Sequence, residues 1–271
     1  MITKAITPVA GWGTRRLPIT KAVEKCMLPI GNRPLVDYVV QDCIKAGITD
    51  IYFVVSEESS QLQAYYSDNG SLNTYLIAAG KEDMLPVVAP PSGVNFHYVT
   101  QDANGKYGTA IPVGLVAPYI QPGESVVVLM GDDFIYNADG SSEVARMIAA
   151  TPENGNAMLG VNIPREHVSR YGVIETNASS EFVRIVEKPA PEQAPSTLIN
   201  VSKYVLNHDL LMAVSHYAEL VLSGEYYITE PINQYVMNGG SLKVMEAQGR
   251  YLDGGSVESW LHANNVVHGG V

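Results

Sequence analysis

The chain carries a glycine-rich loop with an unusual concentration of cations directly after its first apolar segment. Gly11 and Gly13 let the backbone approach a ligand closely and present N–H groups to phosphate. Four cations follow in a chain that has only 17 lysines and arginines: Arg15, Arg16, Lys21 and Lys25. Cations clustered in this way predict a polyanionic ligand such as a nucleoside triphosphate. A turn with solvated charges is the alternative interpretation.

Two further segments place carboxylates where they could bind a metal ion. Asp132 and Asp133 follow the apolar run 125–130, and ligands of open α/β sheets bind at the carboxyl ends of strands. We expect one of the pair to point into the site and the other to cap the following turn. Asp253 lies in a second glycine-rich loop. Magnesium prefers one or two carboxylates plus phosphate oxygens, so Asp132 and Asp253 are its candidate ligands. A polar strand end and a plain turn are the alternatives.

The tripeptide Glu187–Lys188–Pro189 follows another predicted strand. Glu187 could accept hydrogen bonds from sugar hydroxyls, and Lys188 could bind a phosphate group. An exposed ion pair explains the same two residues equally well, so the tripeptide alone is a weak indication.

Two common nucleotide-binding patterns are absent from the glycine-rich loop. The P-loop requires four residues between its glycines and then Gly-Lys-Ser/Thr, which the loop lacks. The dinucleotide fingerprint requires a third glycine and an immediate helix, but Arg16 occupies that position and Pro18 intervenes. The sequence therefore disfavours a P-loop NTPase and a dehydrogenase.

The composition of the 271 residues, with 46% hydrophobic, is that of a globular protein. A net charge of −11 disfavours binding to nucleic acid. We expect no membrane helix and no signal peptide, because no apolar run is long enough and the N-terminus lacks an apolar h-region. Cys26 and Cys43 suggest neither a zinc site nor a disulfide scaffold, which favours a cytoplasmic protein with reduced thiols. Cys43 is expected in the core, and a nucleophilic role for Cys26 is disfavoured.

The elements that position these residues alternate between strands and helices in the first half of the chain. Apolar runs predict strands at 5–9, 51–55, 96–99 and 125–130, followed later by 157–161, 172–176, 182–186, 198–205 and 242–247. Helical spacing predicts helices at 34–46, 59–79 (broken near Asn69–Gly70), 108–117, 209–222, 230–237 and 257–265. Cap chemistry supports these ends, with Pro34 in a first helical turn, Gly47 after a last turn, and Thr229 and Ser256 as N-caps. The alternation indicates an α/β fold with a mainly parallel sheet.

These motifs together resemble the signature of the sugar-1-phosphate nucleotidyltransferases, a glycine-rich G-x-G-T-R-x-x-P-x-T followed by K-x-x-L-P. In this chain the run reads G-W-G-T-R-R-L-P-I-T-K-A-V-E-K-C-M-L-P-I. The opening T-P-V-A-G and the later T-K-A are most similar to the bacterial UTP–glucose-1-phosphate uridylyltransferase group. The resemblance continues in order through residues 65–81, 101–110, 131–133, 170–173, 186–189, 203–205 and 251–255.

The resemblance implies a Rossmann-like nucleotidyltransferase fold, in which a central mixed, mostly parallel sheet is flanked by helices and joined by a β-rich sugar-binding part. We expect one domain over residues 1–271, with 1–155 mainly binding nucleotide and 156–271 mainly binding sugar. The implied nucleotide-binding residues are Ala10, Gly11, Gly13, Gln101, Gly108 and Asp132. The implied catalytic cations are Arg15, Lys25 and Lys188. The implied sugar-phosphate residues are Gly172, Glu187 and Lys188, and the implied Mg²⁺ ligands are Asp132 and Asp253.

The implied reaction converts UTP and glucose 1-phosphate into UDP-glucose and pyrophosphate. The sugar phosphate is already anionic at neutral pH, so no general base is needed, and the protein must instead offset the repulsion between two anions. The resemblance also implies a homodimer or homotetramer and small-molecule partners only, without nucleic acid or membrane.

Some residues depart from the pattern of this group. Thr109 stands where histidine is frequent, Ser202 stands where glycine is usual near the sugar, and Trp12 is large for its loop. The indole of Trp12 either covers the nucleotide or packs against a neighbouring element. Two alternatives follow: the same chemistry with another nucleotide or sugar, such as dTTP or galactose 1-phosphate, or a catalytically silent regulatory homologue. A sugar-binding module without chemistry is disfavoured, because it would not need a polycationic loop.

Overall fold

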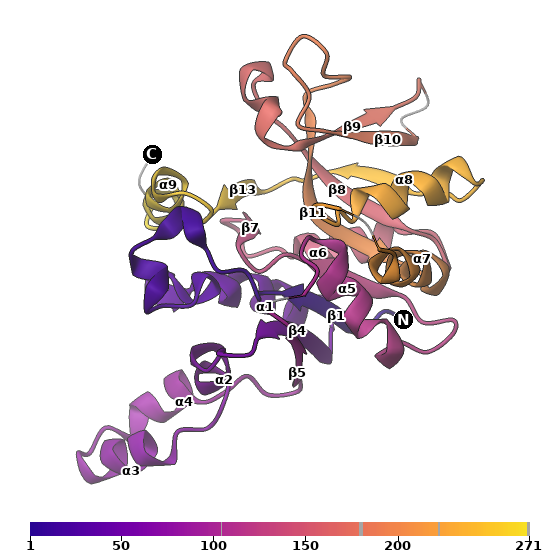
Figure 1. The fold of residues 1–271 in the computed structure, drawn as a ribbon. Coiled ribbons are helices and arrows are strands. Elements are labelled where there is room, and N and C mark those ends of the chain that lie inside the picture. Colours follow the sequence, from indigo (N-terminus) through magenta and orange to yellow (C-terminus); the bar gives the residue numbers. More distant parts are fainter. Residues whose placement is uncertain (104, 179–180, 222, 270–271) are drawn as a thin grey trace.

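Nine of the described strands form one mixed sheet (Figure 1) in a computed structural model that describes residues 1–103, 105–178, 181–221 and 223–269. The strands are β1 (Lys4–Pro8), β2 (Pro29–Ile30), β3 (Arg33–Pro34), β4 (Asp50–Ser56), β5 (Asn95–Gln101), β6 (Val126–Leu129), β7 (Asp133–Tyr136), β8 (Ala157–Asn162), β9 (Gly172–Thr176), β10 (Phe182–Glu187), β11 (Leu198–Leu206), β12 (Lys243–Glu246) and β13 (Arg250–Asp253). The helices are α1 (Leu35–Lys45), α2 (Gln61–Tyr65), α3 (Gly70–Ala78), α4 (Leu85–Val88), α5 (Ala110–Val116), α6 (Glu143–Ala150), α7 (His208–Glu219), α8 (Thr229–Met237) and α9 (Val257–Val267).

The sheet has a parallel part from the first half of the chain and a largely antiparallel part from the second. Strand β1 pairs in parallel with both β4 and β6, and β5 extends this part beside β4. Strand β11 pairs antiparallel with β6, β8 and β9, and thereby joins the two parts. The predicted mixed sheet flanked by helices is therefore confirmed.

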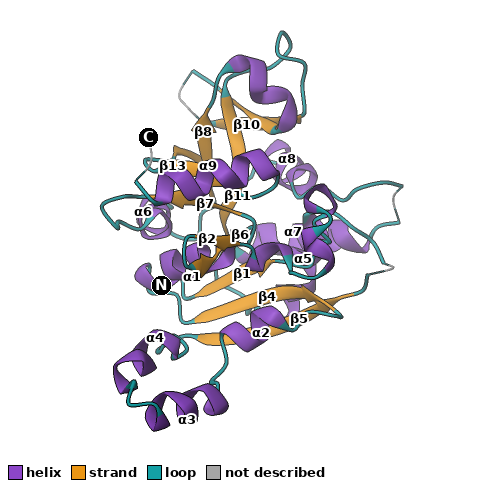
Figure 2. Ribbon diagram, turned by 90° about the vertical axis from the view of Figure 1, so that its left-hand side faces the viewer, coloured by secondary structure: helices purple, strands orange, loops and turns teal. Residues whose placement is uncertain are grey.

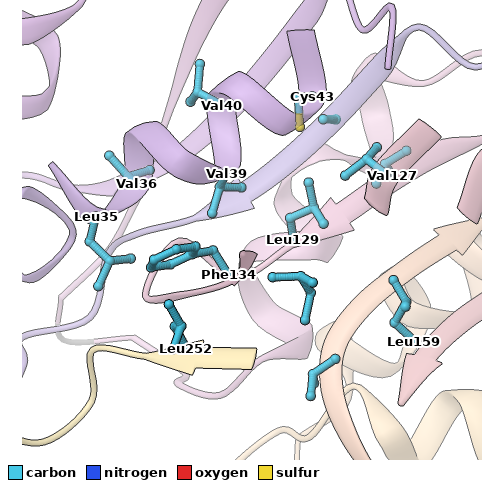
Figure 3. Close-up of a cluster of buried hydrophobic side chains, with 14 of the residues drawn as sticks. Leu35, Val36, Val39, Val40, Cys43, Val127, Leu129, Phe134, Leu159 and Leu252 are labelled. Carbon is cyan, nitrogen blue, oxygen red and sulfur yellow. The ribbon is translucent and has the colours of Figure 1, made fainter. Parts of the chain in front are cut away.

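Hydrophobic side chains fill both faces of the parallel part. Successive residues of β6 alternate between two buried clusters, so that Val127 and Leu129 face α1 while Val126 and Val128 face α5 and α7. Figure 3 shows Val127 and Leu129 beside the α1 side chains and Phe134. Because both faces are covered, β6 has no polar side, which explains its continuous apolar sequence.

Helix α1 has the apolar spacing predicted from the sequence. Leu35, Val39 and Cys43 are buried on its sheet-facing side, and Gly47 follows its end with φ +82°. A left-handed residue after the last turn is the usual end of a helix, so the predicted role of Gly47 is confirmed. Pro34 lies one position earlier than predicted, as the extended N-cap before Leu35.

The glycine-rich loop after β1 folds into three short 3-10 segments, Thr14–Arg16, Ile19–Lys21 and Lys25–Met27. Arg16 anchors this loop: its side chain is only 3% exposed. The guanidinium donates to the carbonyls of Gly254 at 3.0 Å and Ser256 at 2.6 Å, and lies 5.0 Å from the ring centroid of Trp260. One of the four clustered cations therefore has a structural role, whereas ligand roles among these cations were predicted only for Arg15 and Lys25.

The segment between β4 and β5 projects from the body of the molecule as a small helical lobe (Figure 2). The predicted long helix is interrupted near Asn69–Gly70 as expected, giving α2 and α3, and the Asn69 side chain caps α3 by accepting from Leu72 N–H at 3.0 Å.

Several described elements were not predicted from the sequence, namely β2, β3, α4, β7, α6 and β13. The Thr229 cap is also wrong, because Ile228 is the N-cap of α8 and the Thr229 hydroxyl donates to Glu187 instead. The Ser256 cap is confirmed, with a reciprocal capping box to Ser259. Helix α7 ends at Glu219, and residue 222 of the predicted 209–222 helix lies outside the described residues.

None of the described helices combines the length and the apolar character that crossing a bilayer would require.

Replacing Arg16 by alanine should lower the free energy of unfolding by about 2–3 kcal/mol, because two carbonyls lose a charged donor in a buried setting. Arg15→Ala is the matched control, since Arg15 is exposed and should change stability by less than about 0.5 kcal/mol. Urea denaturation of the two variants measures the difference. Equal stability of both variants would contradict the anchoring role.

Candidate active site

A cavity of about 200 Å³ opens at the carboxyl ends of β1 and β6, where the glycine-rich loop begins. We call it the first cavity. Six of the predicted nucleotide-binding and catalytic residues line it: Ala10, Gly11, Lys25, Gln101, Gly108 and Asp132. They come from three separated segments, which the parallel pairing of β1 with β4 and β6, and of β4 with β5, brings to one edge of the sheet.

A second cavity, of about 310 Å³, adjoins the first. Thr109, Met130 and Asp132 line both. The predicted residues in the wall of the second cavity are Arg15, Asp132, Gly172, Glu187 and Asp253. The structure therefore gathers most of the predicted site around two connected spaces with Asp132 between them.

Two predicted residues are not in either wall. Gly13, with φ +64°, is the N-cap of the first 3-10 segment, and a β-carbon there would lie 2.9 Å from Thr20 Cγ2 and 3.1 Å from Lys25 Cβ. The absence of a side chain therefore lets the loop close onto Lys25. Lys188 lies beside the second cavity, where its Nζ is 3.3 Å from the hydroxyl of Tyr227, a wall residue.

The ammonium of Lys25 forms an ion pair with the carboxylate of Asp132 at the junction of the cavities. Burial acts to raise the pKa of Asp132, but Lys25, helped by Lys203 and Arg15, outweighs it and holds that pKa below its ordinary value. Asp132 therefore carries a negative charge at neutral pH while facing two cavities.

Asp253 reaches the site through the short antiparallel pair of β7 and β13. Its register partner is Asp133, and the N–H of Gly254 donates to the carbonyl of Asp132 at 3.0 Å. Burial raises the pKa of Asp253, and the negative charge of Asp132 adds to that rise. The two predicted metal ligands are thus neighbours whose charges repel one another.

Asp133 does not cap the following turn, contrary to the sequence-based expectation. Its carboxylate forms a buried ion pair with Lys203 and accepts a hydrogen bond from the Tyr251 hydroxyl at 3.1 Å. Burial raises the pKa of Asp133 to about 6, although Lys203 opposes that rise. The pair fastens β7 to β11 and β13 directly behind Asp132.

Glu187 lies at the end of β10 in the second cavity and is held by α8. The Thr229 hydroxyl donates to its Oε1 at 2.7 Å, while burial raises its pKa. Lys188 follows with φ +46°, and its contact with the Tyr227 hydroxyl raises its pKa. The positive charge of Lys188 opposes the rise in the pKa of Glu187, so the two charges lie near one another beside the second cavity.

Gly108 faces a backbone rather than open space. Its φ is +126°, and a β-carbon would lie 2.4 Å from the backbone N of Tyr226. The backbone N–H of Tyr226 donates to the carbonyl of Tyr107, and the carbonyl of Tyr226 accepts from the N–H of Ala110, both at 2.9 Å. Glycine at this position lets the first-half loop pair with a segment of the second half beside the first cavity, which Gly108 and Glu225 both line.

The remaining sequence candidates fall outside the cavities or are inert. Trp12 is 61% exposed and Lys21 is also exposed, so the indole does not pack in the core. Cys26 lines the first cavity, but burial raises its pKa to about 12, which leaves it as a thiol. Cys43 is fully buried in the core, as predicted.

Sequence reasoning missed several residues of the walls. Glu225 lines the first cavity, and the second is lined by Asn200, Tyr227 and Thr229. These residues lie in segments without a motif, and only the folding of the second half around the first brings them to the site. Within the described residues, no three His, Cys, Asp or Glu side chains group as a metal site, so Asp132 and Asp253 could hold a cation only with further ligands.

A comparison with known families identifies the class of protein to which this chain belongs. The family described as nucleotidyl transferase matches residues 4–269. The chain belongs to the nucleotidyl transferase family. It is therefore an enzyme of the nucleotidyltransferase class, and the identification from the glycine-rich loop is confirmed.

Named relatives agree with the resemblance to the uridylyltransferase group. A putative UTP–glucose-1-phosphate uridylyltransferase of Methanocaldococcus jannaschii is 34% identical over 97% of this chain and 92% of its own length. The UTP–glucose-1-phosphate uridylyltransferase of Pseudomonas aeruginosa is 30% identical over 99% of this chain and 96% of its own.

Solved structures share the fold. A UTP-bound UGPase from Acinetobacter baumannii superimposes with a TM-score of 0.88 at 26% identity, covering 98% of this chain and 93% of its own. A UDP-glucose pyrophosphorylase complexed with UDP-glucose gives 0.83 at 27% identity, covering 99% of each chain. A putative glucose-1-phosphate thymidylyltransferase from Bacillus anthracis gives 0.73 at 25%, covering 97% of this chain and 94% of its own.

Lys203→Met should lower the free energy of unfolding by about 3–5 kcal/mol, because Asp133 would be left as a buried charge without its cation. Lys243→Met removes an exposed lysine and serves as the control, with an expected change below about 0.5 kcal/mol. Chemical denaturation at neutral pH compares the two. A Lys203 variant as stable as the control would show that the pair does not hold the site together.

Proposed function

We propose that this nucleotidyltransferase joins UTP and glucose 1-phosphate to give UDP-glucose and pyrophosphate. The observation that carries the proposal is the pair of connected cavities with Asp132 in both walls. Two connected spaces suit two substrates that must meet at one phosphorus atom. The names of the relatives, and the UTP and UDP-glucose complexes of the similar structures, support this choice of substrates.

In this proposal the first cavity takes the nucleotide. Gln101 and Gly108 contact the uracil and its ribose, while the backbone of Ala10, Gly11 and Gly13 follows the phosphates. Arg15 and Lys25 hold the triphosphate charge, which their position at the two cavities supports.

The second cavity takes the sugar phosphate. Gly172 and Glu187 hold the glucose hydroxyls, and Glu187 is suited to accept hydrogen bonds because Thr229 orients its carboxylate. Lys188 binds the phosphate that joins the two substrates. Its contact with the Tyr227 hydroxyl, 3.3 Å away, keeps the ammonium near the cavity.

Mg²⁺ fits the paired carboxylates of Asp132 and Asp253. Both carboxylates line the second cavity, and the repulsion that contributes to the raised pKa of Asp253 would be relieved by a divalent cation. Phosphate oxygens would complete its ligands. When bound, the ion supplies positive charge to the phosphate oxygens.

The reaction needs no general base, because the attacking oxygen of glucose 1-phosphate is already ionised. That oxygen forms a bond to the α-phosphorus of UTP as the bond to the leaving pyrophosphate breaks on the opposite side. Lys25, Arg15 and Lys188 offset the repulsion between the two anions and stabilise the charge that shifts to pyrophosphate.

We further propose that residues 1–271 act as a single domain, which the continuous sheet supports. Assembly into a homodimer or homotetramer and a cytoplasmic location remain predictions. The same chemistry with dTTP is the second candidate, favoured by the likeness to the putative thymidylyltransferase.

Pyrophosphate release with glucose 1-phosphate and Mg²⁺ tests the function, with UTP, dTTP, CTP, ATP and GTP compared in parallel. We expect a strong preference for UTP. Loss of activity is expected with excess chelator and in Asp132→Ala. A preference for dTTP would show that the nucleotide substrate is dTTP and not UTP, and would leave the proposed reaction unchanged. If none of the nucleotides gives pyrophosphate release, even when other sugar 1-phosphates are tried, the result would favour the silent regulatory homologue.

Lys25→Met should reduce kcat by about 10²–10³, the usual cost of removing one group that stabilises transition-state charge. Lys21→Met is the matched control, because Lys21 belongs to the same loop but is exposed outside both cavities. Thermal unfolding of both variants guards against a folding defect. Equal kcat in the two variants would remove Lys25 from the catalytic set.

A further inference from the structure

Ser202 has a backbone conformation that disfavours a side chain, and it lines the second cavity. Among the described residues, three non-glycines have positive φ angles: Asn154, Lys188 and Ser202. Ser202 has φ +52°, where glycine is unstrained and most L-residues are not. Strain of this kind persists where the surrounding structure imposes it, often at ligand sites.

A local irregularity of β11 imposes this conformation. The pairing of β11 with β8 shifts register between Asn200 and Tyr204. The Asn200 side chain spans the bulge, because its Oδ1 accepts from the Ser202 N–H at 3.0 Å and its Nδ2 donates to the Tyr204 hydroxyl at 2.7 Å. Tyr204 is fully buried, so its hydroxyl is a fixed point for this clamp.

The clamp places Ser202 in the same wall as the residues proposed to hold the sugar. The second cavity is lined by Ser202 together with Asn200, Gly172 and Glu187. A glycine at position 202 would satisfy the backbone with less strain, and would leave the cavity larger by a β-carbon and a hydroxyl. Serine adds a β-carbon and a hydroxyl in this wall of the cavity, and the hydroxyl also hydrogen-bonds with the buried Tyr204 hydroxyl, which fixes its position.

We infer that Ser202 is a specificity-determining residue that selects the sugar 1-phosphate. Its hydroxyl exchanges a hydrogen bond with a sugar hydroxyl, and its β-carbon limits the space beside that position. The favoured substrates are simple hexose 1-phosphates, and hexoses with a bulky acetamido group are excluded. This inference rests on the proposed function, because it takes the second cavity as the sugar site.

Two substitutions separate the hydroxyl from the β-carbon. Ser202→Ala removes only the hydroxyl and should raise KM for glucose 1-phosphate about fivefold, the usual effect of one neutral hydrogen bond, with KM for UTP unchanged. Ser202→Gly also removes the β-carbon and should raise kcat/KM for N-acetylglucosamine 1-phosphate about tenfold relative to glucose 1-phosphate. Galactose 1-phosphate completes the comparison, because it differs from glucose 1-phosphate only in the orientation of one hydroxyl.

Asn154→Gly is the matched control. It relaxes another left-handed residue, with φ +55°, that does not line the second cavity, so it should leave the preference among the three sugar phosphates unchanged. Wild-type enzyme that forms no nucleotide sugar would overturn the proposed function. Active wild type, with the same sugar preference in both Ser202 variants, would overturn this inference alone. The alanine variant retains a side chain at position 202, so it tests the hydroxyl even if the glycine variant folds poorly.

Discussion

The arrangement of this site depends on holding two like charges together. Asp132 and Asp253 lie side by side at the edge of a mostly apolar sheet, and neither burial nor mutual repulsion favours them. The short ladder of β7 and β13 fixes Asp253 opposite Asp133, and the Gly254 N–H donates to the carbonyl of Asp132. Lys25 then pairs with Asp132, and Lys203 pairs with the adjacent Asp133. The carboxylates of this site are thus kept together by the cations around them, and the proposed cation and polyphosphate would enter this balance of charges.

Local sequence was sufficient to predict those elements whose structure depends mainly on their own residues. Strand β6 is apolar because both its faces are covered, and the α1 spacing and the Ser256 cap were likewise predicted. Strands β7 and β13 are four residues each and are stabilised by pairing between segments far apart in the chain. No local pattern indicates such a pair. Thr229 was misassigned for a related reason, since its hydroxyl serves Glu187 from another strand rather than its own helix.

The residues of the site likewise divide into those that local sequence predicts and those that depend on distant parts of the chain. Of the four clustered cations, Lys25 lies in the wall of the first cavity and Arg15 in the wall of the second, whereas the binding of a polyanion there stays a prediction. The same clustering could not distinguish Arg16, because its partners are carbonyls near residue 255 that become neighbours only in the folded chain. Glu225 and Asn200 had no motif at all. Composition therefore predicts which charges a site needs, whereas tertiary pairing decides which residues supply them.

The pairing of Tyr226 with the backbone around Gly108 has a consequence for how such an enzyme can be divided. Each side of this contact belongs to a different half of the chain, and β11 enters the sheet beside β6 in the same interleaved manner. Cutting the chain near residue 155 would expose the edge of β6, take Glu225 from the first cavity, and divide the lining of the second cavity between the two fragments. Neither fragment would retain a complete site, so activity from split fragments would require their reassembly. The two halves act as interlocked parts and are not exchangeable modules.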